Sequence, residues 1–524
     1  MTKRYLLGVD IGTYSSKGAL INEDGSLVAS HVEPHGIDLP RPSWVEQDAD
    51  AVWWRDFVVI CRRLLTESGI SATAIAAVGV SSTSPCLLPV DKDGRPLRPG
   101  ILYGIDTRAT QEIGELETIF GRQALFDRYG ATLSSQHIAP KIRWLQNHEP
   151  HVWARTHLLL SGTGYVVYRL TGAATIDIYD ANAYVPLFDN RALDWDEDAA
   201  AQIAPLAWLP RIAWTCEVAG EVHAEAAAAT GLAEGTPVII GTADAAAEAI
   251  SAGLAHMGDL MVMYGSSIFF ILKHTHFVRS RYFWTGPFLE LGTYAVTGGM
   301  STAGSLTRWF RDHFAPEEVA AERAGGANAY VALAALAASS PVGANGLVAL
   351  PYFAGERTPL HDPDARGLLI GLTLSHTRAD IYRALLESVG YGIRHNIDTM
   401  NEEGIHPQRI LAVGGGVQNL AWMQMVSDIA DIEQHIPDQQ IGASYGDALL
   451  AGVGVGIFSD ITTAAKLVSH SAVIRPVRSM TERYQPFYQL YRELYTQVAP
   501  TMHKLTVLAR SPSTLQSVHG AENA

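Results

Sequence analysis

The sequence predicts an α/β protein with two large domains, and three observations support this prediction. The chain has 524 residues, which is too many for a single hydrophobic core. Short apolar segments that predict strands alternate with segments whose apolar residues have helical spacing. Turns that contain glycine and hydroxyl residues follow apolar strands in both halves of the chain. We therefore expect alternating strands and helices in each half.

Composition excludes several classes of protein. Asp and Glu number 54 against 38 Lys and Arg, giving a net charge of −16, so no nucleic-acid partner is expected. The apolar run Leu449 to Phe458 is about half as long as a membrane span. Asp10 interrupts the apolar N-terminal stretch, so no signal peptide and no membrane contact are expected. Three scattered cysteines, Cys61, Cys86 and Cys216, indicate a reducing compartment and predict a cytoplasmic protein.

The first informative segment is a glycine- and hydroxyl-rich turn near the N-terminus. An apolar run, Tyr5 to Val9, enters it, and an alternating run, Lys17 to Ile21, leaves it. This pattern predicts a β-hairpin whose turn offers backbone N–H groups and hydroxyls to phosphate. Asp10 ends the first strand, where its carboxylate can hold Mg²⁺ or the waters of Mg²⁺. A surface hairpin with ordinary turn residues explains these residues equally well.

The next segments follow the α/β pattern. Asn22 to Gly25 is typical of a tight turn. Apolar residues between Trp53 and Leu65 have helical spacing, and Asp48 or Asp50 is placed to cap that helix. The apolar residues of Ile75 to Ser81 predict a short buried strand.

The region from Val238 repeats the N-terminal pattern. Val238 to Gly241 predicts an apolar strand that leads to Asp244. Leu260 to Tyr264 predicts another strand, which ends in Gly265-Ser266-Ser267 and is followed by the apolar run Ile268 to Leu272. Two phosphate-type hairpins, one in each half, suggest a duplicated fold whose halves hold one nucleotide. A chance recurrence of two short turns is the alternative.

A third glycine cluster follows the apolar strand Ile410 to Val413. Gly414, Gly415 and Gly416 allow a ligand to approach the backbone, and the helix expected from about Leu420 begins just after Asn419. The cluster is not the GxGxxG of a dinucleotide fold, and the chain contains no GxxxxGK[ST] phosphate loop.

Asp244 is the candidate general base. It follows a buried strand, and the small residues Ala243, Ala245 and Ala246 leave room for a substrate beside it. A carboxylate so placed can accept the proton of a hydroxyl as its oxygen attacks phosphorus. The alternative is structural, because Asp is a favoured residue at the start of a helix.

Taken together, these segments resemble the FGGY family of carbohydrate kinases in the actin–hexokinase superfamily, and in particular its xylulokinase-like branch. The resemblance runs from about Tyr5 to about Tyr491. Ile138 and Leu385 are off the family's pattern. The matching segments are Ser43 to Asp48, Ala139 to Leu145, Leu350 to Pro359, Gly367 to Leu372, Ala384 to Glu387 and Gly446 to Ala448.

The resemblance implies an α/β fold of two actin/hexokinase-like (RNase H-like) domains with a central cleft. It implies an N-terminal domain over residues 1–250, with the sugar site and the first hairpin. A C-terminal domain with the nucleotide site would cover residues 251–505. The polar tail, residues 506–524, is expected to be disordered, above all from Ser511.

The resemblance also assigns roles to single residues, with ATP and Mg²⁺ as the implied cofactors. Asp244 would be the catalytic base and would contact the sugar. Asp10 would hold Mg²⁺, directly or through water. The residues implied in ATP binding are Thr13, Lys17, Ser266, Gly304, Arg308, Gly415 and Asn419.

The predicted sugar site is where the chain departs from the family. Ser84 and Pro85 stand where xylulokinases usually have Met-His, so a hydroxyl replaces an imidazole near the sugar. Asp106 and Arg108 remain as candidates for sugar binding and for local pairing, although one residue is inserted in their motif.

The sequence therefore predicts ATP-dependent phosphorylation of a small sugar, with D-xylulose as the best single substrate. A kinase of ribulose, glycerol or a sugar alcohol is the alternative, followed by an actin-like ATPase that is no kinase. The expected partners are the sugar and ATP, and a homodimer is a family-level expectation.

Overall fold

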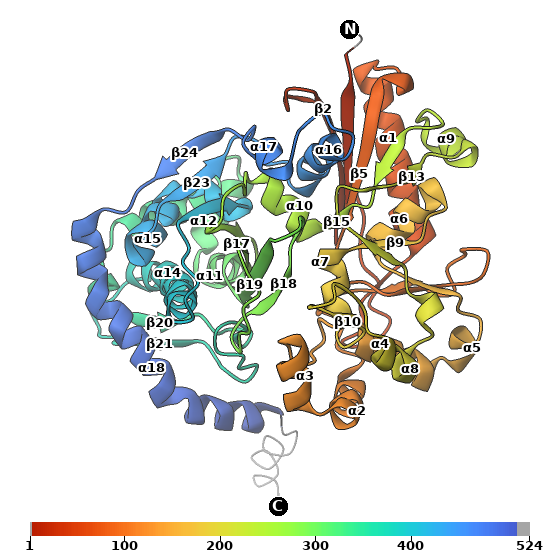
Figure 1. Ribbon diagram of the computed structural model, residues 1–524. Coiled ribbons are helices and arrows are strands. Elements are labelled where there is room, and N and C mark those ends of the chain that lie inside the picture. Colours follow the sequence, from red (N-terminus) through yellow and green to blue (C-terminus); the bar gives the residue numbers. More distant parts are fainter. Residues whose placement is uncertain (1–2, 511–524) are drawn as a thin grey trace, which may run out of the picture. The chain divides into compact units, whose positions relative to one another are not determined.

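The computed structural model describes residues 3–510 and divides into two compact units (Figure 1). Within the described residues, unit 1 comprises 3–257, 271–296 and 437–469, and unit 2 comprises 258–270, 297–436 and 470–510. Each unit is therefore assembled from several segments of the chain. The domain limits at 1–250 and 251–505 stay predictions. Of the predicted tail, residues 511–524 lie outside the described residues, whereas 506–510 end helix α18 (Arg478–Arg510).

Unit 1 contains a seven-stranded sheet whose central strand carries Asp10. The order is β13-β14-β5-β1-β2-β3, with β15 also paired to β5. Strand β1 runs antiparallel to β2 and parallel to β5, so the predicted hairpin and the predicted strand are confirmed. The strands are β1 (Tyr5–Ile11), β2 (Ser15–Asn22), β3 (Leu27–Pro34), β5 (Ile75–Ser82), β13 (Val218–Glu221), β14 (Pro237–Ile239) and β15 (Thr242–Ala243).

Glycines in two sheet strands let a helix of unit 1 approach β1 and β5 closely. A Cβ on Gly8 would lie 1.9 Å from the Ser444 carbonyl oxygen, and one on Gly79 would lie 2.2 Å from the Asp447 carbonyl oxygen. Both carbonyls belong to α16 (Ala443–Gly454), which also packs against α10 (Asp244–Ser251). This packing brings the start of α16 to the strand ends that carry Asp10 and Ser81.

Helix α1 (Arg55–Ser68) covers β2 and β3 and continues from a π-helical segment, Ala49–Trp54. The Asp48 side chain caps that segment by accepting hydrogen bonds from the N–H groups of Asp50 and Ala51. Of the two predicted caps, Asp48 is the one that acts at this position.

A second apolar cluster of unit 1 lies between short helices and strands and includes Ile142, Leu145 and Tyr184. The remaining elements of unit 1 are β4 (Glu46–Gln47), β6 (Leu88–Val90), β7 (Gly100–Ile101), α2 (Thr110–Phe120), α3 (Arg122–Tyr129), α4 (Ile138–His148), α5 (Pro150–Trp153), β8 (Leu158–Leu160), α6 (Gly162–Thr171), β9 (Thr175–Asp177), α7 (Ile178–Ala181), β10 (Phe188–Asp189), β11 (Asp194–Trp195), α8 (Glu197–Ile203), β12 (Arg211–Ala213), α9 (Ala224–Thr230), β18 (Trp284–Pro287) and α17 (Ile461–Ala465).

Unit 2 is built on strands in the order β19-β17-β16-β22-β23-β24, with β16 parallel to β22. The strands are β16 (Asp259–Tyr264), β17 (Ile268–His274), β19 (Tyr294–Met300), β20 (Val348–Leu350), β21 (Leu368–Ile370), β22 (Arg409–Val413), β23 (Gln434–Pro437) and β24 (His470–Ile474). The helices are α11 (Gly304–Phe314), α12 (Pro316–Arg323), α13 (Ala329–Ala338), α14 (Arg378–Glu402), α15 (Leu420–Ala430) and α18.

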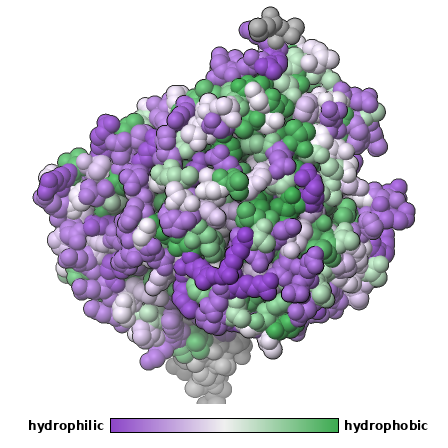
Figure 2. Space-filling model, viewed as in Figure 1, coloured by the Kyte–Doolittle hydropathy of each residue, from purple (hydrophilic) through white to green (hydrophobic). Residues whose placement is uncertain are grey.

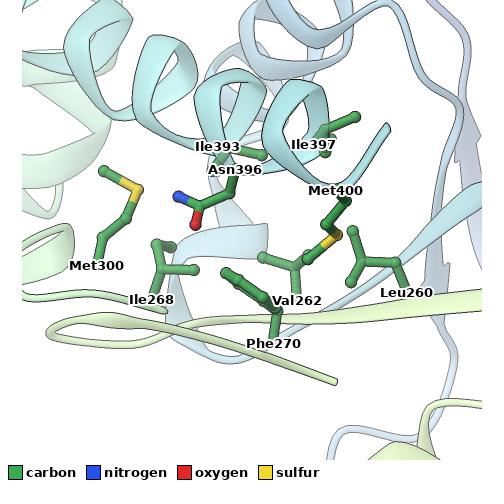
Figure 3. A pocket seen from close by; sticks show the side chains of 9 residues that line it. All are labelled: Leu260, Val262, Ile268, Phe270, Met300, Ile393, Asn396, Ile397 and Met400. Atoms are coloured by element: carbon green, nitrogen blue, oxygen red, sulfur yellow. The ribbon is translucent and has the colours of Figure 1, made fainter. Parts of the chain in front are cut away.

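The interior of unit 2 contains an apolar pocket between α14 and the sheet (Figure 3). Asn396 is the one polar side chain that lines it. Its amide is already used, because Oδ1 accepts a hydrogen bond from the Thr358 hydroxyl and Nδ2 donates to the Gly392 carbonyl. With no free polar group, this pocket is a packing feature and offers nothing to a polar ligand.

Hydrophilic residues cover most of the face drawn in Figure 2, with hydrophobic residues between them. From residue 3 to residue 510, no helix combines the length and the apolar character that a membrane span requires.

Candidate functional site

A buried pair of carboxylates shares one hydroxyl in unit 1. The Ser81 hydroxyl, at the end of β5, donates to Asp447 Oδ2 at 2.7 Å and lies 3.4 Å from Asp10 Oδ1. Asp10 is 6% exposed and Asp447 is fully buried. The second carboxylate oxygen of Asp447, Oδ1, is buried with no hydrogen-bond partner among the described residues. Sequence reasoning missed Asp447, because only the fold brings α16 to the end of β1.

Helix α10 adds two more carboxylates. Asp244 is the first residue of the helix, and its Oδ1 accepts a hydrogen bond from the Ala245 N–H at 2.7 Å. Glu248 lies one helical turn further on, and therefore on the same face. Lys17 is the register partner of Asp10 across the β1–β2 hairpin. The hairpin and α10 therefore bring Asp10, Asp244, Glu248 and Lys17 into one region.

The electrostatics of this region follow from removing carboxylates from water beside one another. Burial raises the pKa of Asp10 to about 6, while Lys17 acts in the opposite direction. Burial and then the Asp10 charge hold the pKa of Asp244 well above its ordinary value. Burial and Asp10 likewise raise the pKa of Asp447 well above its ordinary value. Such a group of carboxylates favours a cation among them.

The turn of the first hairpin is held by side chains from other elements. His35 contacts the Gly12 carbonyl through Nε2 at 2.9 Å and Asp56 Oδ2 through Nδ1 at 2.7 Å. Gln47 Nε2 donates to the Thr13 carbonyl at 2.9 Å. These contacts fix the turn, and sequence reasoning missed them because the supporting residues lie 20 to 45 residues away.

The Thr13 hydroxyl points to the predicted sugar side of unit 1. It lies 3.3 Å from the Thr83 hydroxyl and 3.4 Å from the Tyr103 hydroxyl. Ser84, which follows Thr83 in the chain, donates its hydroxyl hydrogen to Asp180 Oδ1 on α7. A cis peptide bond joins Ser84 to Pro85. The turn and the Ser84–Pro85 segment therefore belong to one continuous polar surface.

Asp177 and Asp180 extend this surface with two buried carboxylates. Asp177 Oδ2 accepts hydrogen bonds from the hydroxyls of Thr242 at 2.7 Å and Thr215 at 3.0 Å. Burial and then the Asp180 charge raise the pKa of Asp177 to about 7. Burial also raises the pKa of Asp180. Thr242 lies two residues before Asp244, and the Asp180 charge also raises the pKa of Asp244, so these carboxylates lie near the candidate base.

Asp106 and Arg108 are paired with protein groups. Arg108 Nη2 lies 2.7 Å from Asp106 Oδ2, and Arg108 Nη1 lies 2.7 Å from Glu46 Oε1. The side chains of Asp106 and Arg108 are both 0% exposed. The guanidinium also lies over Trp44, at 4.3 Å from the ring centroid, and over Trp144, at 4.9 Å. The predicted local pairing is thus confirmed, and the sugar-binding role stays a prediction.

In unit 2 the second glycine turn meets the start of α11. The Gly304 N–H donates to the Gly265 carbonyl at 2.9 Å, and the Ala303 and Ser305 N–H groups donate to the Ser266 carbonyl. A Cβ on Gly304 would lie 2.6 Å from the Gly265 carbonyl oxygen, so only glycine fits there. Arg308 is exposed one turn along the same helix.

The third glycine cluster packs against the same turn. A Cβ on Gly414 would lie 2.9 Å from the Tyr264 carbonyl oxygen, and one on Gly416 would lie 2.8 Å from the Tyr264 Cβ. A Cβ on Gly415 would have no neighbouring atom within 4 Å, so the backbone of this residue is open to a ligand. Asn419 caps α15 by accepting a hydrogen bond from the Trp422 N–H at 3.1 Å.

A hollow in unit 2 begins at this cap. Asn419, Trp422, Arg383 and Tyr484 are among the residues that line it. Its wall therefore combines aromatic rings, a guanidinium and the amide next to the open glycine. Aromatic faces and a few polar groups are the usual lining of a site for a planar heterocycle.

No group of three or more His, Cys, Asp and Glu side chains in the described part of the chain is arranged to hold a metal ion by itself. The oxygen atoms of Asp10 and the unpartnered Oδ1 of Asp447 nevertheless fit Mg²⁺, which takes oxygen ligands and retains several waters. Mg²⁺ typically binds through one or two carboxylates together with substrate phosphates, and the residues present agree with that mode.

Comparison with known proteins identifies the family. The model of the N-terminal domain of the FGGY family of carbohydrate kinases matches residues 5–251, and the model of its C-terminal domain matches residues 260–455. The chain belongs to the FGGY family of carbohydrate kinases. It is a kinase that transfers a phosphoryl group from ATP, as the resemblance in the sequence predicts.

Individual relatives match over nearly their full length. A xylulose kinase from Bacillus subtilis is 29% identical over 499 residues, which cover 94% of this chain and 97% of the relative. A ribulokinase from Geobacillus thermodenitrificans is 28% identical and is covered to 94%. The crystal structure of a xylulose kinase from Rhodospirillum rubrum has a TM-score of 0.88 and 32% identity, covering 95% of this chain and 100% of that one. These matches confirm the predicted α/β, actin/hexokinase-like fold of two domains.

Proposed function

We propose that this kinase phosphorylates D-xylulose to D-xylulose 5-phosphate with MgATP in the cytoplasm. The observation that carries the proposal is the placement of Asp244 at the start of α10, in the same buried group as Asp10 and beside the phosphate-type hairpin. The names of the relatives from Bacillus subtilis and Rhodospirillum rubrum support the choice of sugar.

In the proposed reaction the sugar's terminal hydroxyl oxygen forms a bond to the γ-phosphorus of ATP. The bond between that phosphorus and the oxygen bridging to the β-phosphate breaks, and ADP leaves with the electron pair. Asp244 accepts the hydroxyl proton. Its raised pKa suits this role, because a carboxylate in a desolvated site is a stronger base than one in water. Phosphoryl transfer then depends on positioning and on charge neutralisation.

Mg²⁺, when bound, neutralises phosphate charge. Asp10 is the residue that would hold the ion, and Asp447, which shares the Ser81 hydroxyl with Asp10, would support that carboxylate. Thr13 would contact the phosphates through its hydroxyl and the backbone of its turn. Lys17 would add a positive charge from the same hairpin. These three roles are all supplied by side chains of unit 1.

Unit 2 contains further residues with proposed roles in ATP binding. Ser266 would offer its exposed hydroxyl to phosphate oxygens. The start of α11 at Gly304 would hold the turn that carries Ser266, because its N–H groups donate to the Gly265 and Ser266 carbonyls. Arg308 would add a charge one turn later. Gly415, which is open, and Asn419, which borders the hollow, would bind the adenosine part.

In the sugar site we assign Ser84 and Pro85 to the wall and Asp180 to the carboxylate that orients the Ser84 hydroxyl. Asp106 and Arg108 act on the sugar by fixing the segment that carries Tyr103. The oxygen atoms of Asp177, Asp180 and Asp244 can hydrogen-bond to hydroxyl groups, which favours a neutral polyhydroxy compound as the substrate.

A second candidate substrate is ribulose, or another neutral ketose or polyol. The observation that favours it is the Ser84–Pro85 departure, because a site that hydrogen-bonds a hydroxyl discriminates strongly between stereoisomers. The ribulokinase relative points in the same direction. A homodimer is proposed only by analogy with the family and is tested by light scattering of the purified chain.

The test is a coupled assay of ADP release over a panel of pentuloses, hexuloses, glycerol and sugar alcohols. We expect the highest kcat/KM with D-xylulose. A higher value with another neutral sugar would replace the substrate but keep the reaction. Absence of ADP release with every member of the panel would contradict the proposed function.

A further inference from the structure

Glu248 is a charged residue near the proposed reaction centre to which the proposed function gives no role. It lies on α10, four residues after Asp244, and points to the same side of the helix. The backbone N–H of Ala443, the first residue of α16, donates a hydrogen bond to its carboxylate. Two helices therefore determine where this carboxylate lies.

The Glu248 carboxylate and the Lys17 ammonium group converge on one glycine. A Cβ built on Gly442 would lie 2.7 Å from Glu248 Oε2 and 3.7 Å from Lys17 Nζ. Gly442 has φ +93°, a backbone conformation that residues with a Cβ rarely adopt. The glycine leaves the space in which the two charged groups approach each other.

Lys17 thus interacts with two carboxylates. Asp10 is its register partner on β1, and Glu248 faces it from α10. If Asp10 were the single counter-charge, the ammonium group would compete with a metal ion for that carboxylate. A second carboxylate, on α10, attracts the ammonium group as well and so weakens its interaction with Asp10.

We propose that Glu248 is a positioning residue, which holds the Lys17 ammonium group toward the ATP phosphates and leaves Asp10 free for Mg²⁺. This inference rests on the proposed function, in which Lys17 and Asp10 serve MgATP. Glu248 itself does not touch the reacting atoms. Its effect on ATP is therefore transmitted through Lys17.

The test is a double-mutant cycle on the full chain with Glu248→Gln and Lys17→Met. Calorimetry measures the dissociation constant for MgATP, and the ADP assay measures the KM for MgATP and for the sugar. We expect Glu248→Gln to weaken MgATP binding about tenfold, as expected for coupled neighbours, with the sugar KM changed less than twofold. In the Lys17→Met background the same change should have almost no effect. Glu248→Asp should restore part of the affinity.

The matched control is Glu225→Gln, the same chemical change at an exposed position in the first turn of α9. Thermal unfolding of each variant separates a folding defect from a binding defect. The inference is overturned if Glu248→Gln behaves like Glu225→Gln, or if the effects of Glu248→Gln and Lys17→Met on binding are additive. Failure of the proposed function gives a different result, namely a wild-type chain that releases no ADP while the binding cycle stays measurable.

Discussion

The two units present different chemical groups at their candidate binding residues. Unit 1 collects carboxylates at the end of β1, at the start of α10 and near the start of α16, where removal from water raises their pKa values. Unit 2 uses glycines, whose missing side chains let Tyr264, Gly265 and the start of α11 come together. Unit 1 thus supplies charged side chains, and unit 2 supplies closely packed backbone turns.

This difference separates the residues that do chemistry from those that bind. A buried carboxylate is costly unless a proton, a cation or a hydrogen bond compensates for its charge, so unit 1 stores electrostatic free energy at the reaction centre. A glycine contact has no charge and acts only through shape. Substitutions in unit 1 should therefore be felt as charge effects, and those in unit 2 as steric effects.

The largest effect on stability is expected from Arg108→Ala in unit 1. The change leaves the Asp106 carboxylate buried without its cation, whereas Glu46 keeps its pair with Arg98. Breaking such a buried pair costs about 3–5 kcal/mol. Urea unfolding measures the loss. The control is Arg63→Ala, whose pair with Glu67 is exposed on α1, and it should have little effect. Equal losses in the two variants would contradict the account of unit 1.

The second largest effect is a dependence of the free energy of unfolding on pH, which Asp177 causes. Its pKa is about 7 in the folded chain and near 3.8 in the unfolded chain. The folded chain therefore holds the proton more tightly, and its stability should fall as the pH rises from about 4 to about 7. For this carboxyl alone the fall is on the order of 2–4 kcal/mol. Asp177→Asn should flatten the curve of unfolding free energy against pH, and an unchanged slope would refute the assignment.

The smallest of the three effects is expected in unit 2, from Gly304→Ala. The added Cβ would meet the Gly265 carbonyl, and relief of such a clash typically costs about 1–3 kcal/mol. MgATP binding should weaken as well, because the turn and the start of α11 move apart. Gly415→Ala is the steric control: its Cβ meets nothing, so its melting temperature should match the wild type. A similar loss of stability in both variants would show that the glycine contact does not matter.

Local patterns were sufficient to predict much of this architecture. The run of apolar residues around Asp10 predicted the β1–β2 hairpin, and Asp48 was identified as one of two possible caps. The strand before Asp244 placed that residue at a strand end, where the structure has it at the start of α10. In each case the signal lies within about ten residues of the feature that it predicts.

The remaining site residues depend on contacts between distant parts of the chain. Asp447 joins the carboxylate group only because α16 packs against Gly8 and Gly79. The sequence alone could not show whether Arg108 binds the sugar or pairs with protein groups, because its partner Glu46 and the ring of Trp44 lie more than 60 residues away in the chain. Such long-range pairing leaves no periodic signal in a single sequence.

The most direct test of the central claim compares the wild type with Asp244→Asn on D-xylulose. The account predicts that the wild type releases ADP in the presence of the sugar. It predicts that Asp244→Asn lowers kcat at least about 100-fold, the usual contribution of a general base, while the dissociation constant for MgATP stays within about threefold of the wild type. An Asp244→Asn variant that keeps a near wild-type kcat would contradict the account.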